Sequence, residues 1–208
     1  MKFLIADDHA IVRKGLIQLL REEFAVAEVT EVANGQAIME EVQKQPWDAI
    51  LLDISMPGRS GIEILKQIRL DGIKTPILII SMYPEEQYAI RALKAGASGF
   101  LNKESATEEL LVAVHKILSG RKYISPLAAE KLARSLSEPL GGPTHERLSD
   151  REMQVLHKIA SGKTVSEIAS ELSLSVNTIT TYRMRILEKL SLNNNAELTR
   201  YAMDHRLA

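Results

Sequence analysis

Short apolar runs alternate with helix-like stretches along the first 120 residues of the chain. The runs at residues 49–52 and 76–80 lack a polar residue at every second position, which indicates buried strands of a sheet. The expected strands lie at residues 2–6, 26–32, 49–52, 76–80 and 99–101. The stretches with helical spacing lie between them, at residues 11–23, 36–44, 60–70, 85–95 and 105–119. Strands that alternate with helices predict an α/β fold with a doubly wound, five-stranded parallel sheet.

The pattern changes after residue 120, where no further strand is predicted. Residues 126–136 predict a short amphipathic helix, and residues 137–144, which contain two prolines and two glycines, predict a break. Four more helices are expected at residues 149–160, 164–172, 175–190 and 196–205. We therefore expect a first domain at 1–120, a linker with a short helix at 121–144, and a small all-α domain at 145–208.

Local spacing also predicts how some helices start and which faces they bury. A serine or threonine followed three residues later by glutamate predicts a capping box, in which side chains bond the free amides of the first turn. The expected pairs are Ser105–Glu108, Ser149–Glu152 and Thr164–Glu167. In the first helix, the spacing assigns Ile11, Val12, Leu16, Leu19 and Leu20 to the apolar face.

Composition and charge narrow the function classes. The 208 residues include no cysteine, which excludes disulfides, thiol catalysis and zinc–thiolate sites. Residues 1–120 hold 13 basic and 17 acidic side chains, whereas residues 121–208 hold 13 basic and 10 acidic ones. The second part is therefore the better candidate to meet a polyanion. The apolar runs are too short to cross a membrane and no signal-peptide pattern is present, so we expect a cytoplasmic protein without a membrane partner.

Polar side chains follow four of the predicted strands at the point where each strand ends. Asp7 and Asp8 follow the first strand, Asp53 ends the central one, and Ser81 and Lys103 follow the fourth and fifth. Each residue alone also fits an ordinary role as a turn cap or a solvated charge. If the strand order is the flavodoxin-like 2-1-3-4-5, however, the three carboxylates face one crevice at the carboxyl edge of the sheet.

Three neighbouring carboxylates repel one another unless a cation lies between them. A set of oxygen ligands without histidine or cysteine favours Mg²⁺, which binds through one or two carboxylates together with phosphate oxygens. A carboxylate nucleophile, a metal ion, a hydroxyl and an ammonium group together indicate a site of phosphoryl transfer.

Residues 1–120 resemble the receiver domain of a two-component response regulator. The matching residues are Asp7, Asp8, Asp53, Met56, Pro57, Gly61, Ser81, Phe100 and Lys103. The resemblance implies that Asp53 accepts a phosphoryl group from a sensor histidine kinase. One departure is Glu104, which follows Lys103 where many receivers have proline, so the cis peptide of those receivers is left open here.

The same resemblance implies roles for the other strand-end residues. Asp8, Asp53 and the carbonyl of Ser55 would bind Mg²⁺, and Asp7 would help through a water molecule. Lys103 would contact the phosphoryl group. Ser81 and Phe100 would form the switch pair, in which the hydroxyl reaches the phosphoryl group and the ring turns inward.

Residues 145–208 resemble the helix-turn-helix domain of LuxR/NarL/FixJ regulators in the segments LSDREMQVLHKIASG, SEIASELSLSVNTI and ILEKL. The helix at 175–190 would then be the recognition helix in double-stranded DNA. Its spacing assigns Val176 and four other apolar residues to the buried side. The residues expected to contact base edges are Thr180, Thr181, Met184 and Asn177, and those expected to contact phosphates are Thr178, Arg185 and Lys189. Arg183 falls on the apolar side and is expected to pair with Glu152.

The two resemblances together predict a phosphorylation-controlled transcription regulator rather than a conventional enzyme. Phosphorylation would favour a homodimer, in which Leu198 and Tyr201 of the last helix join two DNA-bound domains. RNA polymerase is a further candidate partner. One alternative is a hydrolase with an aspartyl-phosphate intermediate, but the sequence Asp53-Ile-Ser55 lacks the second carboxylate of haloacid-dehalogenase-type enzymes. The other alternative is an interaction module that is never phosphorylated, against which the complete acidic set argues.

Overall fold

The computed structural model describes residues 1–137, 144–205 and 207, and it divides into two compact units, Met1–Arg134 and Ser135–Ala208. Within the described residues, every helix is too short or too polar to span a lipid bilayer. The part of the expected linker at 138–143 lies outside the described residues.

The first unit contains the predicted five-stranded parallel sheet, and its order is β2-β1-β3-β4-β5. The strands are β1 (Lys2–Ala6), β2 (Glu28–Val32), β3 (Ala49–Asp53), β4 (Ile77–Ser81) and β5 (Gly99–Asn102). Every residue of β3 and β4 is buried, as the uninterrupted apolar runs predict. Because β1 pairs with β3, with Ala6 opposite Leu52, the residues that follow β1 lie beside the end of β3. The predicted strand order is therefore confirmed.

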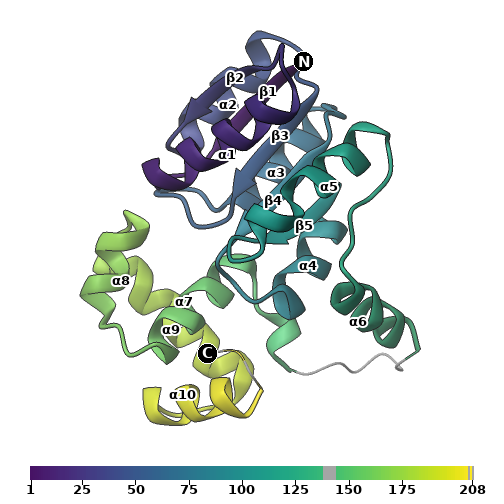
Figure 1. Cartoon of the computed structure of the whole chain (residues 1–208). Coiled ribbons are helices and arrows are strands. Elements are labelled where there is room, and N and C mark those ends of the chain that lie inside the picture. Colours follow the sequence, from purple (N-terminus) through teal and green to yellow (C-terminus); the bar gives the residue numbers. More distant parts are fainter. Residues whose placement is uncertain (138–143, 206, 208) are drawn as a thin grey trace. The chain divides into compact units, whose positions relative to one another are not determined.

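Five helices follow the strands and cover both faces of the sheet (Figure 1). They are α1 (Ala10–Glu23), α2 (Gly35–Lys44), α3 (Gly61–Leu70), α4 (Glu85–Lys94) and α5 (Ala106–Leu118), and α6 (Pro126–Ser137) comes after them. The α1 and α5 helices contact each other, and their apolar side chains form one core with β1, β3, β4 and β5. The α2 and α3 helices contact each other and, in Figure 1, lie on the opposite face of the sheet.

A half-buried arginine links the loops at the amino-terminal edge of the sheet. The guanidinium of Arg69, at the end of α3, donates three hydrogen bonds to backbone carbonyls. The acceptors are Gly96 at 2.9 Å, Ile73 at 2.8 Å and Thr75 at 3.0 Å. Burial lowers the pKa of Arg69 from its ordinary value. One side chain therefore connects the chain segments that lead into β4 and β5.

Two local predictions for the first unit are wrong. Ile11 is 87% exposed, because at 100° per residue it lies about 140° from Leu16 and opposite Leu20, which are buried. Ser105 forms no capping box: its backbone is already helical, and its hydroxyl donates to the carbonyl of Asn102. The side chain of Asn102 instead accepts the Glu104 amide at 2.8 Å, one turn earlier than the sequence pattern suggests.

The second unit is helical. It contains a 3₁₀ turn at Thr144–Arg147 and the helices α7 (Asp150–Ala160), α8 (Val165–Leu172), α9 (Val176–Leu190) and α10 (Asn195–Asp204). The capping boxes that begin at Ser149 and Thr164 are both present, and Ser175 caps α9 by accepting the Thr178 amide at 3.0 Å. Between α8 and α9 the chain turns at Ser173, which has a left-handed backbone with φ 52°.

Candidate functional site

Strand order brings the predicted carboxylates together at the carboxyl edge of the sheet. Asp7, Asp8 and Asp53 each offer an oxygen, and His9 offers a ring nitrogen, such that these four atoms all lie within 4.8 Å of one another. Asp7 and Asp53 are each only 1% exposed, whereas Asp8 lies at an intermediate depth. The Asp7 carboxylate accepts the backbone amide of His9 at 2.7 Å.

Lys103 supplies the positive charge that the sequence places after β5. Its Nζ lies 2.6 Å from Asp7 Oδ2 and 3.1 Å from Asp53 Oδ2. Burial raises the pKa of Asp53 to about 6; Lys103 acts against this rise and the charge of Asp7 adds to it. The Lys103–Glu104 peptide is trans, as are all described peptide bonds, which answers the question left open by Glu104.

The two predicted switch residues are both buried in this structure. Ser81 has no exposed surface, and its Oγ accepts the backbone amide of Tyr83 at 3.1 Å. Phe100 is 2% exposed, so its ring already lies inside the protein. Ser81 and Phe100 lie on the adjacent strands β4 and β5, where Ser81 pairs with Asn102.

A glycine allows α3 to begin directly against the end of β3. A Cβ atom on Gly61 would lie 2.0 Å from the carbonyl oxygen of Asp53, a distance at which atoms overlap. The amide of Gly61 donates to the carbonyl of Ile54 at 2.9 Å, and the amide of Ser60 donates to Glu63 at 3.0 Å. Only glycine fits here, so Gly61 helps to position Asp53 without providing a side chain.

The donor set fits a divalent cation. Three carboxylates and one ammonium group leave a formal excess of two negative charges in a small, mostly buried volume. Moreover, Asp53 Oδ1 is buried and has no partner at hydrogen-bond geometry among the described residues, although the backbone of Ser55 and the ammonium of Lys103 lower the pKa of this carboxyl. His9, which is not among the site residues expected from the sequence, also places a ring nitrogen among these atoms. Its position directly after Asp8 was the available signal in the sequence.

The predicted recognition helix, α9, has a buried side and an exposed side. Ile179 and Ile186 have no exposed surface, whereas Met184 is 61% exposed. Asn177, Thr181, Arg185 and Lys189 are exposed, and Thr178 and Thr180 are half-buried. Asn177, Thr178, Thr181 and Arg185 line one shallow hollow of about 340 Å³ together with Tyr182. Val176 does not belong to the buried side as predicted: it is 49% exposed, at the first position of the helix.

Three hydroxyl groups on α9 already have partners within the helix or at its N-cap. Thr180 donates to the carbonyl of Val176, and Thr181 to that of Asn177, each at 2.9 Å. The hydroxyl of Thr178 lies 2.8 Å from Ser175 Oγ. A hydroxyl that donates to the carbonyl four residues earlier has no second hydrogen to give to another group.

The ion pairs of the second unit differ from the prediction. Glu152 pairs with Lys189 at 2.6 Å rather than with Arg183, which instead donates to Asn195. Lys189, expected to contact phosphate, is therefore bound to a carboxylate in this structure. Leu198 has no exposed surface, and its helix α10 packs against α7. This burial contradicts the predicted role of Leu198 in joining two DNA-bound domains.

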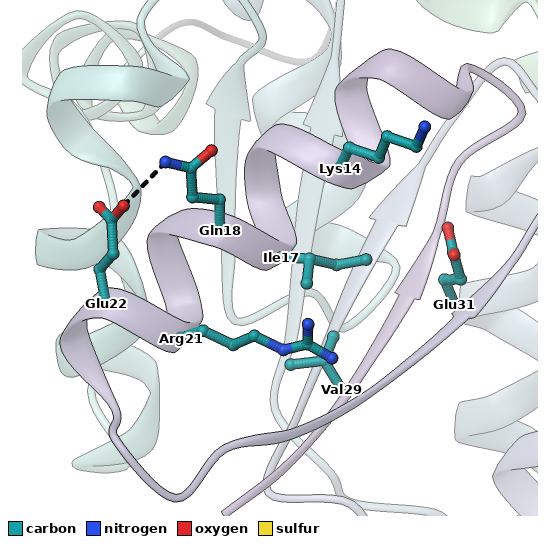
Figure 2. Close-up of a pocket in the computed structure, with 7 residues that line it drawn as sticks. All are labelled: Lys14, Ile17, Gln18, Arg21, Glu22, Val29 and Glu31. Carbon is teal, nitrogen blue, oxygen red and sulfur yellow. Dashed lines mark hydrogen bonds between the residues drawn. The ribbon is translucent and has the colours of Figure 1, made fainter.

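A separate hollow of about 540 Å³ lies between α1 and β2 and includes none of the predicted site residues. Figure 2 shows its lining, in which the amide of Gln18 donates to Glu22 along the outer side of α1. The remaining lining residues are Lys14, Ile17, Arg21, Val29 and Glu31.

Comparisons with known proteins assign both halves of the chain. Residues 3–115 match the family model of the response regulator receiver domain, and residues 146–202 match that of bacterial regulatory proteins of the luxR family. The response regulator UvrY of Escherichia coli K12 is 32% identical over 98% of this chain and 94% of its own length. The transcriptional regulatory protein UhpA of the same strain is 38% identical over 96% of each chain.

Solved structures agree with these matches. The RcsB protein from Salmonella enterica serovar Typhimurium, solved bound to the rprA promoter in the presence of a phosphomimetic, covers 97% of each chain with a TM-score of 0.66 and 27% identity. The receiver match thus precedes the luxR-type match along this chain, and these relatives align with nearly its whole length. The chain belongs to the family of response regulators that join a receiver domain to a LuxR-type DNA-binding domain and control transcription.

Proposed function

We propose that Asp53 is the residue on which this response regulator accepts a phosphoryl group from a sensor histidine kinase. The observation that carries the proposal is the arrangement around Asp53: a buried carboxylate beside Asp7 and Asp8, with Lys103 Nζ at 3.1 Å. The carboxylate would attack the phosphorus atom of the donor. The bond from phosphorus to the leaving group breaks, and the leaving group departs with the electron pair. With a pKa of about 6, Asp53 is ionised roughly ten to one at pH 7, so no base is required.

The surrounding residues would bind the ion and the phosphoryl group. Asp8, Asp53 and the carbonyl of Ser55 would hold Mg²⁺, and Asp7 would act through a water molecule. The ion, when bound, would neutralise charge on the phosphoryl oxygens. Lys103 would exchange part of its contact with the carboxylates for a phosphoryl oxygen. The same groups would support self-catalysed phosphoryl transfer and dephosphorylation, with no separate substrate pocket.

Ser81 and Phe100 would transmit the modification. A phosphoryl group on Asp53 carries about −1.5 to −2 charges in place of the single carboxylate charge, and it brings strong acceptor oxygens to this edge of the sheet. The Ser81 hydroxyl would donate to one of these oxygens. Because Phe100 is already buried in this structure, we propose that phosphorylation stabilises the inward position of its ring rather than creating it.

The exposed side of α9 would bind the major groove of double-stranded DNA. Thr180, Thr181, Met184 and Asn177 would contact base edges. Since the two threonine hydroxyls donate within the helix, their contacts would be made mainly through methyl groups, which suits the methyl of thymine. The residues proposed for phosphate contacts are Thr178, Arg185 and Lys189. Lys189 would have to break its ion pair with Glu152 to reach a phosphate, so its contact would contribute the least binding free energy of the three.

Domain boundaries and assembly form part of the same proposal. We propose a receiver at residues 1–120, a linker at 121–144 and a DNA-binding domain at 145–208 of a cytoplasmic protein. Phosphorylation would favour a homodimer that binds two half-sites, with RNA polymerase as a further partner. Because Leu198 is buried, the contact between DNA-bound domains would use exposed residues of α10 rather than Leu198.

Mass spectrometry tests the phosphorylation site. The full chain is incubated with acetyl phosphate and Mg²⁺, and the mass of the intact protein and of its peptides is measured. We expect one phosphoryl group on Asp53, none in Asp53→Ala, and slower uptake in Asp8→Ala because that residue provides only charge and ligation. Asp71→Ala, which removes an exposed carboxylate at the end of α3, is the matched control. Uptake at the normal rate by Asp53→Ala would refute the assignment.

A further inference from the structure

A histidine lies at the edge of the acidic cluster. His9 Nδ1 is 2.7 Å from Asp8 Oδ1 and 3.3 Å from Asp7 Oδ1. It belongs to the group of four residues whose ligand atoms lie within 4.8 Å of one another. The imidazole side chain is 61% exposed, so it borders the cluster on the solvent side.

The backbone holds His9 in this place. Its amide donates to Asp7 Oδ1 at 2.7 Å, and its extended backbone, with φ −86° and ψ 106°, makes it the residue that precedes α1. His9 contributes no side-chain cap to that helix. The main chain therefore places residue 9 beside the carboxylates, and the helix start does not depend on its imidazole.

A second observation indicates that the cluster needs a partner from outside the chain. Asp53 is 1% exposed, and its Oδ1 has no partner at hydrogen-bond geometry among the described residues. A buried carboxylate oxygen in that state is costly unless an ion or a donor contacts it. The Asp53 carboxylate offers one oxygen to the same group of donor atoms as the His9 nitrogen.

We propose that His9 is a nitrogen ligand of the divalent-cation site, which rests on the proposed function of that site. The bound ion would then have two kinds of ligand: oxygens, from the carboxylates of Asp8 and Asp53 and the carbonyl of Ser55, and one imidazole nitrogen. Imidazole adds little for Mg²⁺, which prefers oxygen and keeps its waters. It adds much for Ni²⁺ and for other transition-metal ions that favour nitrogen. The site therefore discriminates less strongly against transition metals than an all-oxygen site does.

Calorimetric titration of the untagged full chain tests this inference with the metal ions themselves. In His9→Ala we expect Ni²⁺ affinity to fall at least tenfold, while Mg²⁺ affinity changes less than twofold. His115→Ala is the matched control, because His115 also pairs with a carboxylate at 2.7 Å, that of Glu23, but lies outside the cluster. It should leave both affinities unchanged. Equal Ni²⁺ affinities in the wild type and His9→Ala would overturn the proposal.

Pulsed electron paramagnetic resonance gives a direct readout with Mn²⁺ in place of Mg²⁺. We expect modulation from a directly bound ¹⁴N nucleus in the wild type and in His115→Ala, and its loss in His9→Ala. Modulation that survives His9→Ala would come from another histidine and would overturn the assignment. Absence of Mg²⁺ binding in the wild type would instead refute the proposed function, so the two failures are distinguishable.

Discussion

Replacing Asp53 by asparagine measures how much the buried carboxylate charge lowers the free energy of unfolding. Burial raises the pKa of Asp53 from its ordinary value of 3.8 to about 6, even though Lys103 acts in the opposite direction. At about 1.4 kcal/mol for each tenfold change in the equilibrium constant, this difference corresponds to about 3 kcal/mol. The ionised carboxylate thus opposes folding by about that amount when no cation is bound.

The sign of the effect follows from proton linkage. Because the pKa in the folded state is higher than in the unfolded chain, the folded protein binds this proton more tightly. The resulting stabilisation is complete below about pH 4 and is lost as the pH rises through 6. Asparagine carries no charge at any pH. We therefore expect Asp53→Asn to raise the free energy of unfolding by up to about 3 kcal/mol at pH 7 and by much less at pH 4.

Urea denaturation in the presence of a chelator provides the assay. The chain has a single tryptophan, Trp47, which is 6% exposed and lies in the receiver, so its fluorescence reports the unfolding of that unit. Adding Mg²⁺ should stabilise the wild type but not Asp53→Asn, which narrows the difference between them. Asp71→Asn, at an exposed carboxylate, should change stability by less than about 0.5 kcal/mol. If Asp53→Asn stabilised the receiver equally at pH 4 and pH 7, or destabilised it, the electrostatic reasoning would be wrong.

Lys103→Met should destabilise the receiver by about 3 kcal/mol at pH 7, because it leaves two buried carboxylates without their cation; Mg²⁺ should restore part of the loss in the same urea assay. Gly61→Ala should lower both stability and Mg²⁺ affinity by forcing Asp53 away, whereas Gly15→Ala, whose Cβ meets no atom within 4 Å, should not destabilise the receiver. Thr181→Val should keep DNA affinity, while Thr181→Ser should lose about tenfold. Replacing the contacted thymine in a selected duplex by deoxyuridine should lower the affinity of the wild type about tenfold, as Thr181→Ser does. If only Thr181→Val lost DNA affinity, the proposed methyl contact would be wrong.

The arrangement of the receiver followed from the sequence because strand ends are encoded locally. The uninterrupted apolar runs before Asp53 and Ser81 fix where each strand stops, and parallel strands bring these ends to one edge. Lys103 follows β5, which is not a neighbour of β3 or β1, so its contacts with Asp53 and Asp7 also depend on the reach of its long side chain. The structure therefore brings the three carboxylates and the ammonium group together, and Ser81 ends the strand next to that of Asp53.

Side-chain pairing could not be predicted in the same way. Glu152 lies on α7 and could reach several cations of α9, and only the packing of the two helices selects Lys189 over Arg183. Ser105 fits the capping pattern, but Asn102 accepts an amide of the preceding turn, so the helical backbone starts earlier. The imidazole of His9 depends on a rotamer at the end of β1, which residue spacing does not encode.

The three hydrogen bonds from Arg69 give the two edges of the receiver sheet different mechanical properties. At the amino-terminal edge, a planar donor group fixes the backbone before β4 and β5, and its contacts do not depend on ions or phosphorylation. At the opposite edge, Asp7, Asp53 and Lys103 are held by charges whose balance changes with every ion or phosphoryl group that binds. We expect the amino-terminal ends of β4 and β5 to stay fixed. A small electrostatic change at the carboxyl edge should therefore displace the carboxyl ends of these strands and the starts of α4 and α5.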